Sequence, residues 1–254
     1  MNYYNDNDAK ACAWLEALIS AGLIPPGDVD NRSIADVKPE ELKGYTQCHF
    51  FAGIGGWSLA LQLAGVGPDV PVWTGSCPCQ PFSSAGKGKG TEDERHLWPE
   101  FARLIGECKP PTVFGEQVAS KAGRAWFDGV STDLENMGYA AAAADLCAAG
   151  VNAPHIRQRL FWVANAVSER RCKRIARCKD AANAAGSGED VWSGYYRGCA
   201  DGYSRRVPPG VPLLANGVPG RVELMRGFGN AIVPQVAAEF IQAYMEIKSE
   251  GANQ

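Results

Sequence analysis

The stretch Phe50-Phe51-Ala52-Gly53-Ile54-Gly55-Gly56 joins two segments of different periodicity. Residues 48–52 have the apolar character of a buried strand, and residues 57–64 resume helical spacing. Glycines at such a junction allow a tight turn and let a ligand approach the N-terminus of a helix, as in the nucleotide-type crevices of open α/β sheets. The stretch is not a G-x-G-x-x-G fingerprint, however, and a purely structural strand-to-helix turn is the more common explanation of such a pattern.

Outward from this turn, short apolar runs alternate with helical stretches, which is the pattern of a parallel α/β sheet. Further strands are predicted at residues 70–74, 112–114, 140–147 and 160–164. Helices are predicted at residues 9–23, 97–105, 121–137 and 232–247.

Composition places the chain among globular proteins, since 46% of its 254 residues are apolar and no run approaches the roughly 20 apolar residues of a membrane span. The polar, acidic residues 1–10 do not resemble a signal peptide. Nine cysteines form an odd set without repeated metal-ligand spacing, which favours reduced thiols and no metal site.

Charge is unevenly distributed along the chain. Residues 165–226 hold 11 Lys/Arg and 6 Asp/Glu, a local charge of +5 within a chain of net charge −3. Glycines and prolines interrupt this segment, and aromatic residues alternate with arginines in it. We therefore predict a catalytic domain built from residues 1–164 plus 227–254, and a loop-rich lobe, 165–226, that faces a polyanion. A solvated insertion is the alternative.

Three segments carry side chains suited to chemistry. Cys79 follows a predicted strand in a frame stiffened by Pro78 and Pro81, where a nucleophilic thiol would be placed, although buried structural cysteines are more common. Glu116 follows another strand and could be held protonated in an apolar crevice, although an isolated Glu is usually solvated. Arg157 and Arg159 share one face of an extended segment, suited to an anion or simply to the surface.

Taken in order, these features resemble the motifs of DNA (cytosine-5) methyltransferases. The matching stretches are Phe51-x-Gly-x-Gly-Gly56, Pro78-Cys-Gln80 with Phe82-Ser83, Glu116-Gln-Val118 in place of Glu-Asn-Val, Arg157-x-Arg159, and Gly229-Asn-Ala-Ile-Val-Pro234. Each motif is short, but five in the right order make coincidence improbable.

The resemblance implies a fold and a chemistry. The fold would be an α/β, Rossmann-like sheet of S-adenosylmethionine-dependent methyltransferases, shortened here, with a small inserted DNA-recognition lobe at 165–226. Cys79 would add to carbon 6 of a flipped-out cytosine, Glu116 would act at ring N3, and Arg157 and Arg159 would hold the base and the carboxylate. The cofactor, S-adenosylmethionine, would contact Phe51, Gly53, Ile54, Gly55, Gly56, Pro78 and Asn230.

The same resemblance implies double-stranded DNA as the partner. We further expect a monomer that needs neither membrane nor metal. Its compactness suggests an enzyme of bacteria, phages or mobile elements, with or without a restriction partner, and a cytoplasmic location in the bacterial or phage-infected cell.

One departure from the family is large. Two strands with acidic residues, which hold the cofactor's ribose and adenine, normally separate the glycine turn from the cysteine, and residues 57–78 leave too little room for them. Asp28, Asp30 or Asp36 of the N-terminal segment could substitute, unless that segment is a surface linker. Alternatively, the cofactor is held weakly or through the backbone, or the thiolate adduct uses another donor or is deaminated. A degenerate DNA-binding scaffold is the non-enzymatic alternative.

Overall fold

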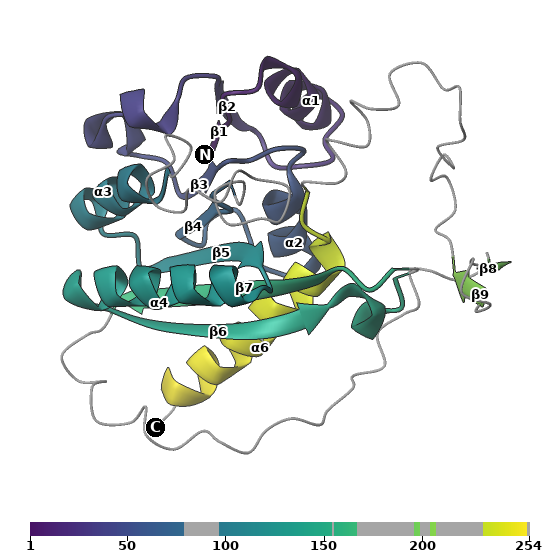
Figure 1. The fold of residues 1–254 in the computed structure, drawn as a ribbon. Helices are drawn as coiled ribbons and strands as arrows, with labels where there is room; N and C mark the ends of the chain where they lie inside the picture. The colour runs from purple at the N-terminus through teal and green to yellow at the C-terminus, as the bar shows by residue number, and fades with distance from the viewer. Residues whose placement is uncertain (79–96, 154, 167–195, 199–203, 207–230, 253–254) are drawn as a thin grey trace.

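A computed structural model describes residues 1–78, 97–153, 155–166, 196–198, 204–206 and 231–252 (Figure 1). Its centre is a seven-stranded sheet in the order β2-β1-β3-β4-β5-β7-β6. The strands are β1 (Asn2–Asn5), β2 (Gly27–Asp30), β3 (Gln47–Phe50), β4 (Val72–Gly75), β5 (Thr112–Val118), β6 (Tyr139–Cys147) and β7 (Gln158–Ala166). The α-helices are α1 (Ala9–Ser20), α2 (Gly56–Leu63), α3 (Trp98–Cys108), α4 (Lys121–Asn136) and α6 (Pro234–Ala252). Short 3₁₀ helices are η1 (Ile34–Asp36), η2 (Pro39–Leu42) and η4 (Ala148–Val151).

The α/β class is confirmed, but the sheet is mixed rather than parallel. Strands β2, β1, β3, β4 and β5 are parallel neighbours, whereas β7 pairs antiparallel with both β5 and β6. The prediction of a parallel sheet was wrong at this edge, because periodicity reports that a strand is buried and not in which direction its neighbour runs.

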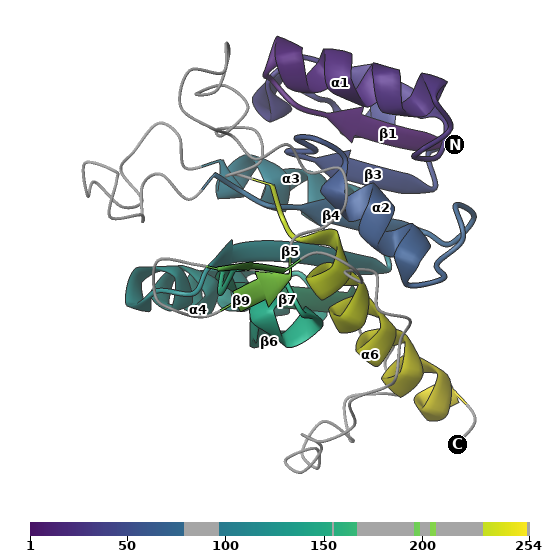
Figure 2. The ribbon, with the colours of Figure 1, turned by 90° about the vertical axis from the view of Figure 1, so that its right-hand side faces the viewer.

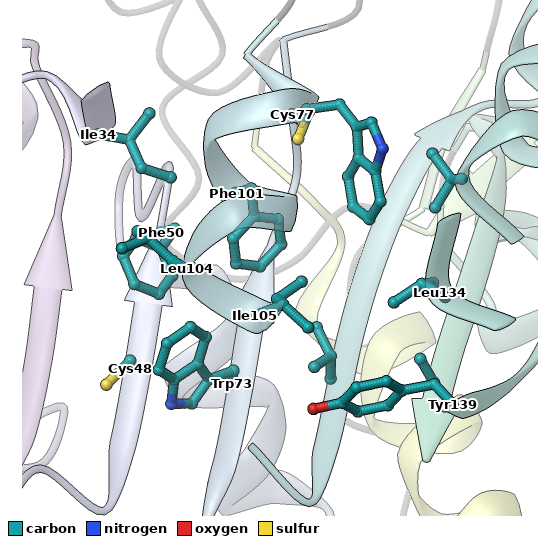
Figure 3. Packing of buried hydrophobic residues seen from close by; sticks show 14 of the residues in the cluster. Ile34, Cys48, Phe50, Trp73, Cys77, Phe101, Leu104, Ile105, Leu134 and Tyr139 are labelled. Atoms are coloured by element: carbon teal, nitrogen blue, oxygen red, sulfur yellow. The ribbon is translucent and has the colours of Figure 1, made fainter. Parts of the chain in front are cut away.

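Helices cover both faces of the sheet. On one face, η1, η2, α3 and α4 pack on the strands through an aromatic-rich cluster that includes Phe50, Trp73 and Phe101 (Figure 3). On the other face, α2 and α6 lie side by side (Figure 2) and bury apolar residues against Phe114 and Phe161. Successive residues of β5 and β7 contribute to opposite clusters, as the alternation of a central strand requires.

The N-terminal segment forms a β1-α1-β2 unit in which neither strand was predicted. All four residues of β1 are buried although two are asparagines. Their side-chain amide N–H groups find acceptors: the Asn2 amide donates to Gln47 Oε1 at 3.1 Å, and the Asn5 amide donates to the Arg32 carbonyl at 2.9 Å. A polar composition therefore concealed a buried strand.

This unit also changes how the shortened sheet is understood. The chain after Gly56 does lack two strands before β4, but β1 and β2 lie beside β3 and complete the seven. Residues 26–38 are therefore not a surface linker, because Gly27–Asp30 is a strand of the sheet and Ile34 is buried in the core.

Within residues 165–226, the structure describes the end of β7 and two short strands, β8 (Tyr196–Gly198) and β9 (Ser204–Arg206). These two strands form an antiparallel pair in which Arg197 is the register partner of Arg205. The proposed recognition lobe otherwise lies outside the described residues. Among the helices that the structure describes, none is both long and apolar enough to cross a membrane.

Candidate active site

The strand registers bring the predicted motifs to one edge of the sheet. Phe50 of β3 is the partner of Gly75 in β4, and Gly75 is the partner of Gly115 in β5. Because these strands are parallel, the residues that follow them emerge at the same edge. The antiparallel β7 begins at that edge, with Arg159 opposite Val118.

The glycine turn between β3 and α2 has the conformation that its sequence predicts. Gly53 has φ of 55° and Gly55 has φ of 79°, a region that residues with a side chain rarely adopt. A Cβ on Gly53 would meet nothing closer than a backbone oxygen at 4.0 Å, so the space beside it is open. A Cβ on Gly56 would lie 2.8 Å from Ile232, so the absence of a side chain at Gly56 lets the segment before α6 pack closely there. Phe51 and Ile54 lie in the same turn, partly buried.

The segment after β4 is tied to this turn. The indole N–H of Trp57, the residue after Gly56, donates to Ser76 Oγ at 2.9 Å. Cys77 is buried, and its burial raises the pKa of its thiol far above the usual value. Pro78 is half-buried at the end of the described segment, and Cys79 lies outside the described residues.

Glu116 is buried and paired with an arginine. Its Oε1 lies 2.7 Å from Arg159 Nε, and only 9% of the Glu116 side chain is exposed. Burial raises the pKa of Glu116, while the positive charges of Arg159 and Arg157 oppose that rise. Since β5 extends to Val118, Glu116 lies within the strand, and the prediction that it follows the strand was wrong.

The side chains of Arg157 and Arg159 have different partners. Arg157 Nη2 donates to the carbonyl of Ala231 at 2.6 Å and so joins the start of β7 to the segment before α6. Asn230, the neighbour of Ala231, lies outside the described residues, whereas His155 is exposed just before Arg157. The structure thus gathers Glu116, Arg159, Arg157 and the glycine turn at one edge of the sheet.

The N-terminal unit adds a carboxylate that the sequence analysis missed. Asp6 directly follows β1, and its Oδ2 accepts the backbone N–H of Gly53 at 2.8 Å. Two of the three acids that were singled out have other partners: Asp30 accepts from Tyr3 and Arg32, and Asp28 accepts from Tyr45, while Asp36 lies in η1. One local feature of the sequence could have pointed to Asp6. Asp8, two residues later, is the N-cap of α1, so Asp6 lies in the short connection between a strand and a helix.

Comparison with known proteins finds a family match over part of the chain. Residues 66–182 match the model of the C-5 cytosine-specific DNA methylase family. This part of the chain is similar to that family. The chain is 28% identical over 167 residues to the Type II methyltransferase M.HhaI of Haemophilus parahaemolyticus, and 33% identical over 98 residues to M.NgoMIV of Neisseria gonorrhoeae.

The methylase relatives are longer than the matched region. It covers 50% of this chain and 51% of M.HhaI, and 37% of this chain and 31% of M.NgoMIV. Among solved structures, a Spodoptera frugiperda DNMT2 mutant has a TM-score of 0.40 at 18% identity, covering 65% of this chain and 42% of that one. The Entamoeba histolytica methyltransferase EhMeth has a TM-score of 0.42 at 14% identity, covering 65% and 45%.

In the described part of the chain, no group of three or more His, Cys, Asp or Glu side chains is placed to hold a metal ion.

Proposed function

We propose that this protein transfers a methyl group from S-adenosylmethionine to carbon 5 of cytosine in double-stranded DNA. The observation that carries the proposal is the buried Glu116–Arg159 pair at the sheet edge where the glycine turn and the Cys77-Pro78 segment end. A binding-only scaffold has no chemical need for a buried carboxyl group beside this segment.

Cys79 is the proposed nucleophile. Of the two neighbouring thiols, Cys77 is buried and its raised pKa keeps it protonated, which makes it a packing residue. Cys79 lies two residues farther on, beyond Pro78. Its thiolate would form a bond to carbon 6 of a cytosine flipped out of the duplex, because carbon 5 alone is a poor nucleophile.

Glu116 would act on the cytosine ring during this addition. A carboxyl group with a raised pKa can give a proton or a hydrogen bond to N3 and so stabilise the electron-rich ring that the thiolate creates. Arg159 would keep the carboxyl group in place. When the carbon-5 proton has been removed, the carbon–sulfur bond breaks and the Cys79 thiolate is restored.

The residues of the glycine turn fit the implied cofactor, which supplies an electrophilic methyl group on sulfur. Positive φ angles at Gly53 and Gly55 and the open space beside Gly53 let a ligand lie against the backbone before α2. Phe51 and Ile54 would offer apolar contacts, and Pro78 and Asn230 remain proposed contacts. The conformation of the turn thus supports the cofactor residues proposed for it.

A 5-fluorocytosine trap tests the proposal. The protein is incubated with a pool of random-sequence duplexes in which 5-fluorocytosine replaces cytosine in one strand, with and without S-adenosylmethionine. Since fluorine cannot leave as the proton does, we expect a denaturant-stable complex that requires the cofactor and disappears in Cys79→Ala. A complex indifferent to the cofactor, or none at all, would overturn methyl transfer and favour another fate of the adduct or a binding scaffold.

We also propose that residues 165–226 form the DNA-recognition lobe on a catalytic domain of residues 1–164 plus 227–254. The support is the local charge of +5, which includes the register partners Arg197 and Arg205. For about four phosphate contacts, DNA affinity should fall about 100-fold between 50 and 200 mM salt.

The double variant Arg197→Gln/Arg205→Gln should flatten that salt dependence, because each lost phosphate contact releases about one counterion fewer. Lys43→Gln, an exposed charge change outside the lobe, is the matched control and should leave the slope unchanged. If the DNA affinity of the unmodified protein did not change with salt concentration, phosphate binding by this lobe would be refuted. Fluorescence anisotropy with a labelled duplex, at a series of salt concentrations, measures the DNA affinity of all three proteins.

A further inference from the structure

The direction of the chain connections changes within the sheet. From β1 the chain passes through α1 to the outer neighbour β2, whereas from β3 it passes through α2 to β4 on the other side. In open α/β sheets, ligands bind at the carboxyl ends of the strands at the point where the connections diverge. In this protein that point lies between β1 and β3 (Figure 1).

Asp6 occupies this point. The pairing of β1 with β3 continues past both strands, because the Ala52 N–H donates to the Asn5 carbonyl at 3.0 Å. The next residue, Asp6, is thereby held beside the glycine turn, where the Gly53 N–H donates to its Oδ2. The Asp8 N–H donates to its Oδ1 at 2.9 Å, so two backbone bonds orient the carboxylate.

The carboxylate retains capacity to bind a ligand. Two carboxylate oxygens offer about four acceptor sites, and the backbone uses two of them. The Asp6 side chain is not fully buried, and the space beside Gly53 is open. Asp28 and Asp30 contrast with it, since the protein's own hydroxyl and guanidinium groups donate to them.

We propose that Asp6 binds the vicinal hydroxyls of the cofactor's ribose, so that the N-terminal β1-α1-β2 unit supplies half of the cofactor site from a position ahead of the glycine turn. A ribose presents two neighbouring O–H donors, which match the two remaining acceptor sites of one carboxylate. This assignment rests on the proposed function, since it names a contact to the proposed cofactor. It also identifies an acid that would take the place of the acidic residues normally carried by the two strands missing after Gly56.

Calorimetric binding of S-adenosylhomocysteine and of its 2′-deoxyadenosyl counterpart tests this contact without relying on turnover. The unmodified protein should bind the ribosyl compound at least about 10-fold more tightly than the deoxy compound. In Asp6→Asn, which can still accept the Gly53 N–H, affinity for S-adenosylhomocysteine should fall about 10- to 100-fold. The preference of Asp6→Asn for the ribosyl compound over the deoxy compound should shrink as well, because the charged acceptor is gone.

The control is Asp8→Asn, which removes the same charge two residues away and still caps α1, because Asn caps as well as Asp. It should bind both compounds as the unmodified protein does. Unchanged affinity in Asp6→Asn, or weaker affinity with the preference for the ribosyl compound intact, would overturn the contact even if the 5-fluorocytosine adduct forms normally. If the unmodified protein binds neither compound and forms no adduct, the proposed function fails together with this inference.

Discussion

Glu116→Ala should lower the single-turnover rate of methylation by about 100- to 10,000-fold while leaving DNA affinity within about threefold of the unmodified protein. The physical reason is that the carboxyl group acts on the ring as the thiolate adds, whereas binding of the duplex relies on other parts of the protein. Glu116 lies in β5 with its carboxyl group buried against Arg159, where burial raises its pKa.

Rapid-quench measurement of methyl transfer to duplex DNA, with anisotropy for affinity, checks this expectation. Glu116→Gln can donate a hydrogen bond but cannot give up a proton, and so should recover part of the rate. Glu135→Ala, an exposed carboxylate on α4, is the matched control and should react normally. A normal rate in Glu116→Ala, with the protein folded by circular dichroism, would remove Glu116 from the mechanism.

Arg159→Ala should destabilise the fold by about 3 kcal/mol near pH 8, because it leaves Glu116 buried without its ion-pair partner. This loss of folding stability should depend on pH. Burial already raises the pKa of Glu116 in the folded protein, and removing Arg159 would raise it further. Between the ordinary carboxyl pKa and this raised value, the folded state binds more protons than the unfolded state, so stability falls as pH rises.

The destabilisation by Arg159→Ala should therefore be small near pH 4.5, grow as pH rises, and level off above the new pKa of Glu116. Urea unfolding at a series of pH values measures it. In the double variant Arg159→Ala/Glu116→Gln, which has no carboxyl group to ionise, the extra pH dependence should vanish. A destabilisation of Arg159→Ala that is equal at all pH values would show that Arg159 contributes by packing alone.

Most central elements were predictable from local patterns. The turn from β3 to α2, strand β4, and helices α3 and α4 follow apolar periodicity and glycine placement, and the structure has each within a few residues of its expected bounds. The convergence of Glu116 and Arg159 did not follow from local patterns, because Arg159 stands at the start of its strand and reaches the edge of Glu116 only since β7 runs antiparallel to β5.

The N-terminal strands were not predictable in this way. β1 is four residues long and has an asparagine at each end, so its composition is that of a loop. Its burial is compatible with this composition because Gln47 and the carbonyl of Arg32 accept hydrogen bonds from its two asparagine amides. The residue pattern therefore pointed to Asp28, Asp30 and Asp36 and gave no sign that Asp6 lies against the glycine turn.

The sequence by itself determined which chemical groups this protein has: a glycine turn, a thiol between prolines, a carboxylate and two arginines in a given order. These groups are recognised from residue types and their spacing over a few neighbouring positions, which the sequence shows directly. The tertiary structure alone decided that β1 lies beside β3, that β7 runs antiparallel, and that Asp6 meets Gly53. The reason is that hydrogen bonds between strands join residues far apart in the chain, and such a sheet can be completed by strands from before the glycine turn as well as from after it.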